Sequence, residues 1–66
     1  MMDELYLVAV SSLEVRSNPD TPSKVFLKRD TAVSILGDTR KKWVKIKTHS
    51  EPVISGYTLK RYLKKV

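Results

Sequence analysis

Apolar residues recur along the chain in short runs that are separated by stretches rich in turn-forming residues. The clearest alternation is that of residues 43–48. Val44 and Ile46 fall on one face of an extended chain there. The opposite face carries Trp43, Lys45 and Lys47. Because successive side chains of a strand point to opposite sides of a sheet, this segment predicts a strand whose valine and isoleucine are buried.

Further segments have the length and composition of strands. They are residues 5–10, 13–16, 25–27, 32–36 and 53–58. Residues 17–23 are expected to form a loop, because Pro19 and Pro22 lack the N–H group that a strand ladder needs. Together these patterns predict an all-β fold, a small barrel or sandwich of five to six short antiparallel strands.

The C-terminal tail has a different periodicity. Its apolar residues are spaced as on one face of a helix: Leu59, Tyr62, Leu63 and Val66. A segment of this length is too short to hold a helix by itself. We therefore expect one short 3-10 turn that leads into a closing strand, and not an amphipathic helix on a membrane surface.

The length of 66 residues sets the scale of the fold. It allows a single domain, residues 1–66 with a barrel core from about residue 5, which buries only about 60% of the surface that the unfolded chain exposes. The chain contains no cysteine, so it can form neither a disulfide nor a thiolate metal site. Its stability is expected to come from packing and backbone pairing.

Charge is concentrated in the second half of the chain. Residues 1–38 hold four basic and six acidic residues, a net charge of −2, whereas residues 39–66 hold nine basic residues and one acidic residue, a net charge of +8. The candidates for a basic surface are Lys41, Lys42, Lys45, Lys47, Lys60, Arg61, Lys64 and Lys65. Such a surface suits nucleic acid, an acidic protein or anionic lipid, but lysines also protect sheet edges from aggregation. Both interpretations remain open.

Several motifs follow one another in a defined order. Residues 13–19 read L-E-V-R-S-N-P, residues 43–46 read W-V-K-I, and residues 56–59 read G-Y-T-L, with Tyr62-Leu63 behind them. In this order they resemble the L-N-V-R-S-G-P, W-x-K-V and G-Y-V-x-x-x-Y-L motifs of bacterial SH3 (SH3b) domains. The resemblance spans residues 5–63 and implies a small SH3-like barrel as a single SH3b-like domain.

Two kinds of departure from the family pattern bear on the loops and the ligand. Asn18 and Asp30 stand where glycines are expected, and these are the non-glycine residues that best tolerate a positive φ. Leu59 stands where eukaryotic SH3 domains have the proline that shapes a polyproline groove. The turns can therefore be kept, whereas a polyproline ligand is not expected.

The resemblance implies a shallow groove beside the loop of residues 17–23. Its candidate ligand-binding residues are Trp43, Tyr57, Tyr62, Asn18 and Asp20. An exposed tryptophan is a suitable contact platform, but an indole that only covers the edge of a thin barrel explains the pattern equally well. Packing of its side chain within the barrel is an equally good explanation for Tyr57. Arg16 is implied to be structural, with its guanidinium bound to loop carbonyls.

Catalytic chemistry finds little support in the sequence. His49 is the only histidine, lies in a predicted polar turn and has no cysteine partner, so a triad or a metal site is not expected. The acidic residues are dispersed over separate loops, and two glycines cannot build a phosphate-binding loop. We expect no enzyme, no metal and no cofactor.

Three functions from different classes remain. The first is a module that binds or tethers a protein or peptide partner, possible ligands including cell-wall peptides, in the aromatic groove. The second is a nucleic-acid-binding module that uses the basic residues with Trp43 stacked on a base. The third is a structural domain, a monomer or weak homo-oligomer, in which residues 5–10 or 59–66 pair with another copy.

The cellular location is predicted from what the N-terminal segment lacks. Residues 1–4 read M-M-D-E, without the basic start and apolar run of a secretory signal, and no stretch approaches the roughly 20 apolar residues of a membrane span. We expect a chain that is cytoplasmic as written, or a domain excised from a larger cell-envelope or phage protein.

Overall fold

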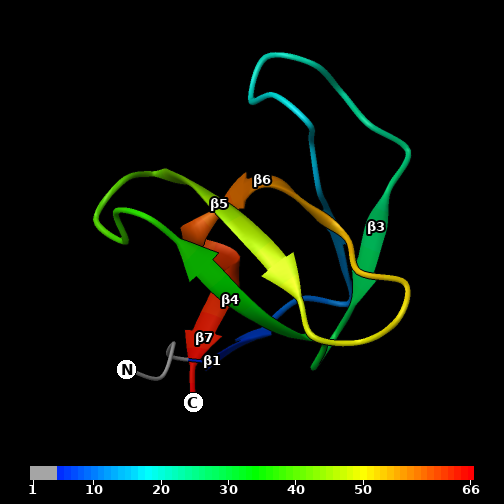
Figure 1. Cartoon of the computed structure of the whole chain (residues 1–66), viewed down its shortest axis with the longest axis vertical. Coiled ribbons are helices and arrows are strands. Elements are labelled where there is room, and N and C mark those ends of the chain that lie inside the picture. The colour runs from blue at the N-terminus through cyan, green and yellow to red at the C-terminus, as the bar shows by residue number, and fades with distance from the viewer. Residues whose placement is uncertain (1–4) are drawn as a thin grey trace.

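Seven short strands and one turn of 3-10 helix form residues 5–66, the part of the chain that the computed structural model describes (Figure 1). In chain order they are β1 (Leu5–Val8), β2 (Ser12–Glu14), β3 (Phe26–Lys28), β4 (Ala32–Leu36), β5 (Trp43–Thr48), β6 (Ser55–Leu59), η1 (Lys60–Tyr62) and β7 (Leu63–Lys65). The predicted all-β class is confirmed. The strands number seven rather than five to six, and the closing strand expected in the tail is the seventh. Residues 1–4 of the predicted domain lie outside the described residues.

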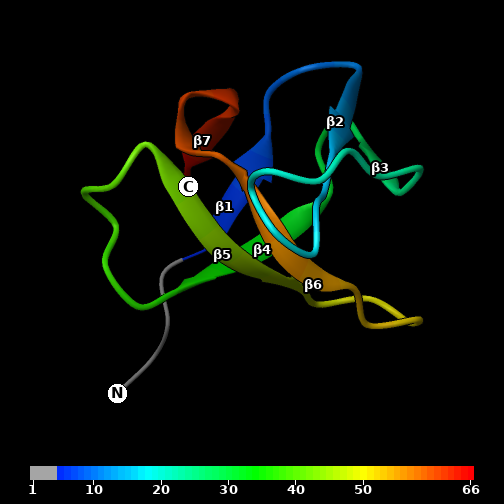
Figure 2. The same cartoon turned by 90° about the horizontal axis from the view of Figure 1, so that it is seen from above.

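The strands form two antiparallel sheets. Five of them pair in the order β6-β5-β4-β1-β7, and β2 pairs with β3. Seen from above, the β2–β3 hairpin stands to one side of the larger sheet (Figure 2). Both sides of β1 are occupied, by β4 and by β7. The expectation that residues 5–10 could pair with another copy is therefore wrong, since β1 has no open edge in this fold.

The chain after β2 closes the barrel. Arg16 forms an antiparallel bridge with Tyr57 of β6, in which the Arg16 N–H donates to the Tyr57 carbonyl over 2.8 Å and the Tyr57 N–H donates back to the Arg16 carbonyl. Gly56 makes this approach possible, because a Cβ at that position would lie 2.6 Å from the Arg16 carbonyl oxygen. The outer edge of β6 is thus joined to the segment that follows β2.

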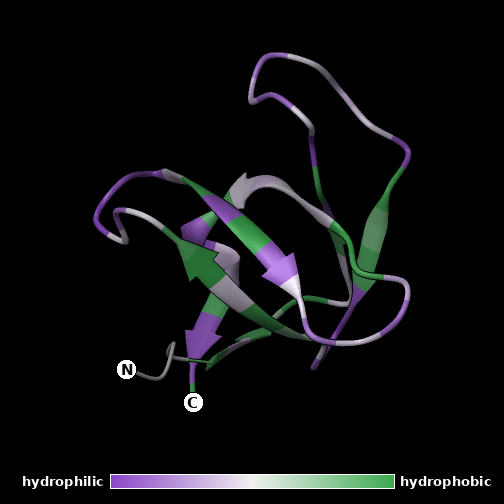
Figure 3. Ribbon diagram, viewed as in Figure 1, coloured by the Kyte–Doolittle hydropathy of each residue, from purple (hydrophilic) through white to green (hydrophobic). Residues whose placement is uncertain are grey.

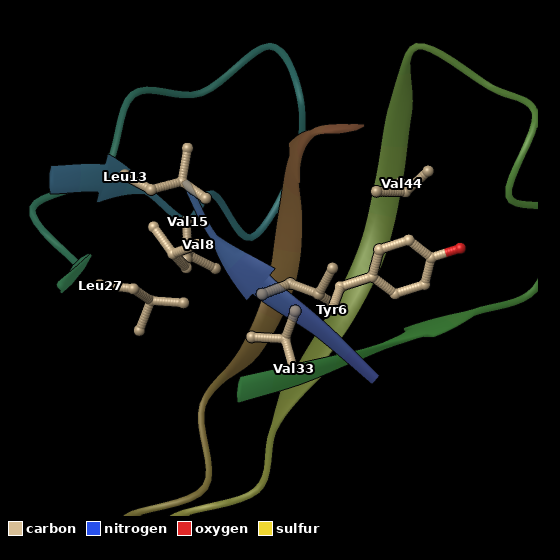
Figure 4. Close-up of a cluster of buried hydrophobic side chains, with 8 residues drawn as sticks. Tyr6, Val8, Leu13, Val15, Leu27, Val33 and Val44 are labelled. Carbon is tan, nitrogen blue, oxygen red and sulfur yellow. The ribbon is translucent and has the colours of Figure 1, made fainter. Parts of the chain in front are cut away.

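The core lies between the two sheets. Its buried apolar side chains are Tyr6, Val8, Leu13, Val15, Leu27, Val33, Val44 and Ile46. Figure 4 shows labelled members of this cluster converging from strands of both sheets. The predicted burial of Val44 and Ile46 is confirmed, since these side chains are 2% and 0% exposed. Hydrophilic colour is concentrated in the connecting loops, on β7 and in bands on β5 (Figure 3).

Three strands are shorter than the sequence pattern predicts. β1 ends at Val8 rather than at residue 10, β2 ends at Glu14 rather than at residue 16, and β6 begins at Ser55 rather than at residue 53. Before β6 the chain turns on Thr48, whose N–H donates to the Ile54 carbonyl and whose Oγ1 accepts from the Ile54 N–H, each over 2.9 Å. This turn takes Val53 out of the sheet and leaves it 53% exposed.

The two residues in place of glycines behave differently. Asp30 has a φ of 68°, in the left-handed region that glycine favours, as the sequence predicts. Asn18 is not among the described residues with positive φ. Its Oδ1 instead accepts a hydrogen bond from the Asp20 N–H over 2.9 Å, a local turn that asparagine supports.

The tail follows the expected path. One turn of 3-10 helix over Lys60–Tyr62 leads into the closing strand β7, and the Ala9 N–H donates to the Tyr62 carbonyl over 2.8 Å. Leu63 and Tyr62 pack against the core and are partly buried. Among residues 5–66, no helix has the length and apolar character needed to cross a membrane.

Candidate functional site

A groove of about 420 Å³ opens where β2, β5, β6 and η1 meet. Its lining residues are Val10, Ser12, Leu13, Glu14, Arg16, Trp43, Thr58, Leu59 and Tyr62. Segments far apart in the chain thus contribute to one hollow, and the lining combines apolar, aromatic and charged side chains. The structure places Trp43 and Tyr62, the two predicted groove walls, in this lining.

Trp43 lies at the start of β5, directly opposite Leu59 of β6. Directly opposed residues share one face of a sheet, so both side chains are on the outer side, away from Val44. The Arg16 guanidinium stands over the indole, with its Cζ 5.3 Å from the ring centroid. This cation–π contact holds the half-buried indole against the segment that closes the barrel.

Glu14 connects the groove to the loop of residues 17–23. Its Oε1 accepts a hydrogen bond from Arg16 Nε over 2.9 Å, and its Oε2 accepts one from the Ser23 N–H over 2.7 Å. Arg16 Nη1 also donates to the Pro19 carbonyl over 2.7 Å, the structural role that the family resemblance implied for this arginine. These hydrogen bonds of the Glu14 carboxylate and the Arg16 guanidinium therefore fix the loop. They also hold Arg16 against the Trp43 ring.

The surroundings of Glu14 favour its ionised form. The Ser23 N–H lowers the pKa of this carboxyl most, and the hydrogen bond and charge of Arg16 lower it further. A group whose pKa is lower in the folded chain than in the unfolded chain stabilises the fold above its unfolded pKa. That contribution is lost as the pH falls through the folded pKa.

We expect an acid titration to release the loop. Below its ordinary pKa of 4.5, Glu14 becomes protonated and its hydrogen bonds from Arg16 and Ser23 weaken. The amide proton shift of Ser23, followed by NMR, is expected to titrate with a midpoint below 4.5. The Glu14→Gln variant should abolish that transition. A midpoint at or above 4.5, or the same transition in the variant, would contradict the role given to Glu14.

Tyr62 forms the opposite wall and carries a second guanidinium. Arg61 Cζ lies 5.0 Å from the Tyr62 ring centroid, and Arg61 Nη2 donates to Tyr62 Oη over 2.9 Å. Arg61 itself is exposed, whereas Tyr62 is partly buried against the core. Each aromatic wall of the groove is thus covered on one face by an arginine.

Three residues that the sequence analysis placed in the groove lie outside its lining. Tyr57 is on the outer face of β6, opposite Lys45 on one side and Arg16 on the other. Asn18 and Asp20 are exposed in the loop and bind each other. The structure brings Tyr57 next to the groove because its cross-strand partner Arg16 lines it, but it does not bring the two loop residues into the lining.

Several lining residues were missed by the sequence analysis as binding residues. They are Val10, Ser12, Leu13, Glu14, Thr58 and Leu59, together with Arg16, whose functional use was not expected. The alternation of β6 could have placed Leu59 on an outer face. Its position beside Trp43, however, depends on the β5–β6 register, which no local pattern specifies.

The eight predicted basic residues are spread over the 37–42 loop, β5, η1 and β7. Lys45 and Lys47 are exposed on the outer face of β5, while Lys64 and Lys65 lie on β7, with β4 and β1 between these two strands in the sheet. The Lys60 N–H donates to the Lys42 carbonyl over 3.0 Å, which brings the 37–42 loop next to η1. None of the eight residues belongs to the lining of the groove.

Asp38, an acidic residue near these basic residues, is paired with Arg40. Asp38 Oδ1 lies 3.2 Å from Arg40 Nε and accepts a hydrogen bond from the Arg40 N–H over 2.9 Å. The Arg40 N–H lowers the Asp38 pKa most, followed by the Arg40 side chain and the charges of Lys41 and Lys60. The positive potential around the groove is thus not cancelled by an unpaired carboxylate at this position.

His49, the only histidine, is exposed after β5. Its Nε2 lies 2.6 Å from Oγ of the buried Ser34, a pairing that the sequence did not indicate. Within residues 5–66, no three histidine, cysteine, aspartate or glutamate side chains gather as a metal-binding set would. The histidine therefore ties the end of β5 to β4.

The arrangement suits non-covalent contact with an extended segment. Two aromatic walls, aliphatic side chains and the Arg16 guanidinium line an open hollow beside a loop that Glu14 holds in place, and a second guanidinium, that of Arg61, lies over the Tyr62 wall. Such a surface can bury apolar side chains and offer hydrogen-bond donors at the rim. Comparison of the chain with protein-family models, curated proteins and solved structures finds no match.

Proposed function

We propose that this protein is a non-catalytic, SH3b-like binding module that holds an extended peptide segment of a partner protein in the groove between Trp43 and Tyr62. The observation that carries the proposal is the convergence of these two aromatic side chains, from β5 and η1, on one hollow with Glu14 and Arg16. Aromatic residues and arginine are the side chains most enriched where proteins bind one another.

The geometry supports an extended ligand. The groove lies where β2, β5 and β6 meet, and its lining includes the apolar side chains of Leu13 and Leu59. Much of this lining belongs to strands, while the adjoining loop is fixed by the Glu14 carboxylate. A preformed site of this kind loses little conformational freedom on binding, which favours affinity for a ligand.

Replacing Trp43 with alanine is expected to weaken peptide binding by about 30-fold, because central aromatic contacts contribute about 2 kcal/mol or more. Binding can be measured by amide-shift titration with a panel of cell-wall peptide fragments and unstructured synthetic peptides. The shifts should cluster at Trp43, Tyr62 and residues 12–16.

Phe26→Ala provides a matched control, since Phe26 is an aromatic residue that is 56% exposed on β3 and does not line the groove. This variant is expected to bind as the unmodified protein does. If no peptide of the panel binds, or if both variants lose affinity equally, the proposed function is wrong.

A second candidate function has one specific observation in its favour. Lys45 and Lys47 share the outer face of β5 with Trp43. Proteins that bind single strands combine cations along the nucleic-acid backbone with an aromatic ring that stacks on a base. Binding to a single-stranded oligonucleotide would then weaken steeply with salt. Amide shifts confined to these lysines and η1, with none in the groove, would favour this function over peptide binding.

A further inference from the structure

We propose that the groove selects peptide segments that carry aspartate or glutamate side chains. This inference rests on the peptide-binding function proposed above and specifies the chemistry of its ligand. It follows from the way the charged groups around the groove are used.

Arg61 is the cation best placed to meet a ligand carboxylate. It is exposed and stacks on Tyr62, with Cζ 5.0 Å from the ring centroid. Its hydrogen bond to Tyr62 Oη uses one N–H of Nη2, and a guanidinium has five N–H donors. The ring orients the planar group, so its other donors are held beside the groove wall, where a carboxylate can accept two of them.

Arg16 has a different role. Its Nε binds Glu14 and its Nη1 binds the Pro19 carbonyl, so these donors serve the protein's own loop. Glu14 is the acidic residue of the groove lining, and its two oxygens are occupied by Arg16 and the Ser23 N–H. The negative charge of Glu14 is thus compensated by groups of the protein itself.

Further positive charge borders the groove on the side of β5. Lys45 is exposed and lies opposite Tyr57, two cross-strand pairs away from Trp43 and Leu59 and on the same face. On the other side, a backbone hydrogen bond from the Lys60 N–H to the Lys42 carbonyl places two more cationic residues near η1. An acidic segment would therefore meet opposite charge along its path, whereas a basic segment would be repelled.

The lining of the groove favours a peptide over nucleic acid as the occupant. The hollow between Trp43 and Tyr62 is lined in part by Val10, Leu13 and Leu59, which suit aliphatic or aromatic side chains of a peptide.

The test uses acetylated, amidated nonapeptides made in pairs that differ only in glutamate or glutamine, so that no terminal charge contributes. Peptides with glutamate are expected to bind about tenfold more tightly at low salt, and the difference should shrink as salt is raised. Arg61→Glu should abolish the preference, and Arg61→Lys should keep most of it because the charge remains.

Lys64→Glu is the matched control, because it makes the same change of net charge on β7, at a residue that does not line the groove and makes no ring contact with Tyr62. This variant is expected to retain the preference for glutamate. If Lys64→Glu lowers the preference as much as Arg61→Glu does, the effect comes from overall charge and the inference is wrong.

The remaining outcomes separate this inference from the function on which it rests. Equal binding of both peptides of each pair, still sensitive to Trp43→Ala, would overturn the preference for acidic segments and leave the peptide-binding function standing. Absence of binding by every peptide would overturn both. Tighter binding of a single-stranded oligonucleotide of equal charge, with competition for the groove, would also overturn the inference.

Discussion

Replacing Ile46 with alanine is expected to lower the free energy of unfolding by about 4 kcal/mol. Ile46 is fully buried at the centre of β5, opposite Gly56 on one side and Ile35 on the other. Removing three carbon atoms loses their transfer free energy and leaves a cavity that the surrounding strands cannot easily fill. A domain of this size has a total stability of roughly 3–10 kcal/mol, so the variant should be partly unfolded at ambient temperature.

The measurement is urea unfolding followed by the fluorescence of Trp43, the single tryptophan. Lys47→Ala, on the exposed face of the same strand, is the control and should change the stability by less than about 0.5 kcal/mol. An Ile46→Ala variant as stable as this control would show that β5 is not the centre of the core.

Replacing Gly56 with alanine is expected to lower the free energy of unfolding by about 3 kcal/mol and to reduce peptide binding as well. A Cβ at this position would lie 2.6 Å from the Arg16 carbonyl oxygen and 2.8 Å from Val15 Cγ1. The first contact is with backbone that also accepts the Tyr57 N–H. The clash must therefore push the segment after β2 away from β6, which opens the barrel where Arg16 supports Trp43.

Ser55→Ala separates this effect from a general loss of strand stability. Ser55 is the exposed neighbour of Gly56 on β6, and its replacement should change stability by less than about 0.5 kcal/mol and leave binding unchanged. Urea unfolding and the amide-shift titration described above measure both quantities. If Gly56→Ala matches this control in both, the close approach of the two segments does not determine closure.

The groove depends on interactions that act together rather than on single residues. Glu14 orients Arg16, Arg16 supports the Trp43 indole, and the same carboxylate holds the loop at Ser23. The Glu14→Gln variant proposed for the acid titration is therefore also expected to disturb the tryptophan environment. Through this coupling, a change at Glu14 can alter the binding surface by way of Arg16.

The predictions from sequence were most accurate where one residue's position depends on its immediate neighbours. Alternation predicted β5 and the burial of Val44, and spacing predicted the turn at η1 and the strand after it. Asp30 adopts the positive φ that its replacement of glycine suggested. These features follow from local geometry, since side chains alternate along a strand and only certain residues accept a left-handed backbone.

The candidate site was predicted only in part. The aromatic character of Trp43 and Tyr62 identified them, and the structure places both in one groove. Asn18 and Asp20 were expected there because they belong to the adjoining loop, but Asn18 binds the Asp20 N–H and both lie outside the lining. Arg16 binds this loop at the Pro19 carbonyl, between the two residues.

By itself the sequence determined the all-β class, the inward face of β5, the turn near the C-terminus and the uneven distribution of charge. Only the tertiary structure decided which strands are neighbours, that β1 has no open edge, and that Arg16 closes the barrel against Tyr57. It also placed β4 and β1 between the lysines of β5 and those of β7. The physical reason is that cross-strand register and long-range packing depend on residues distant in the chain, whereas alternation and turn preference depend on adjacent ones.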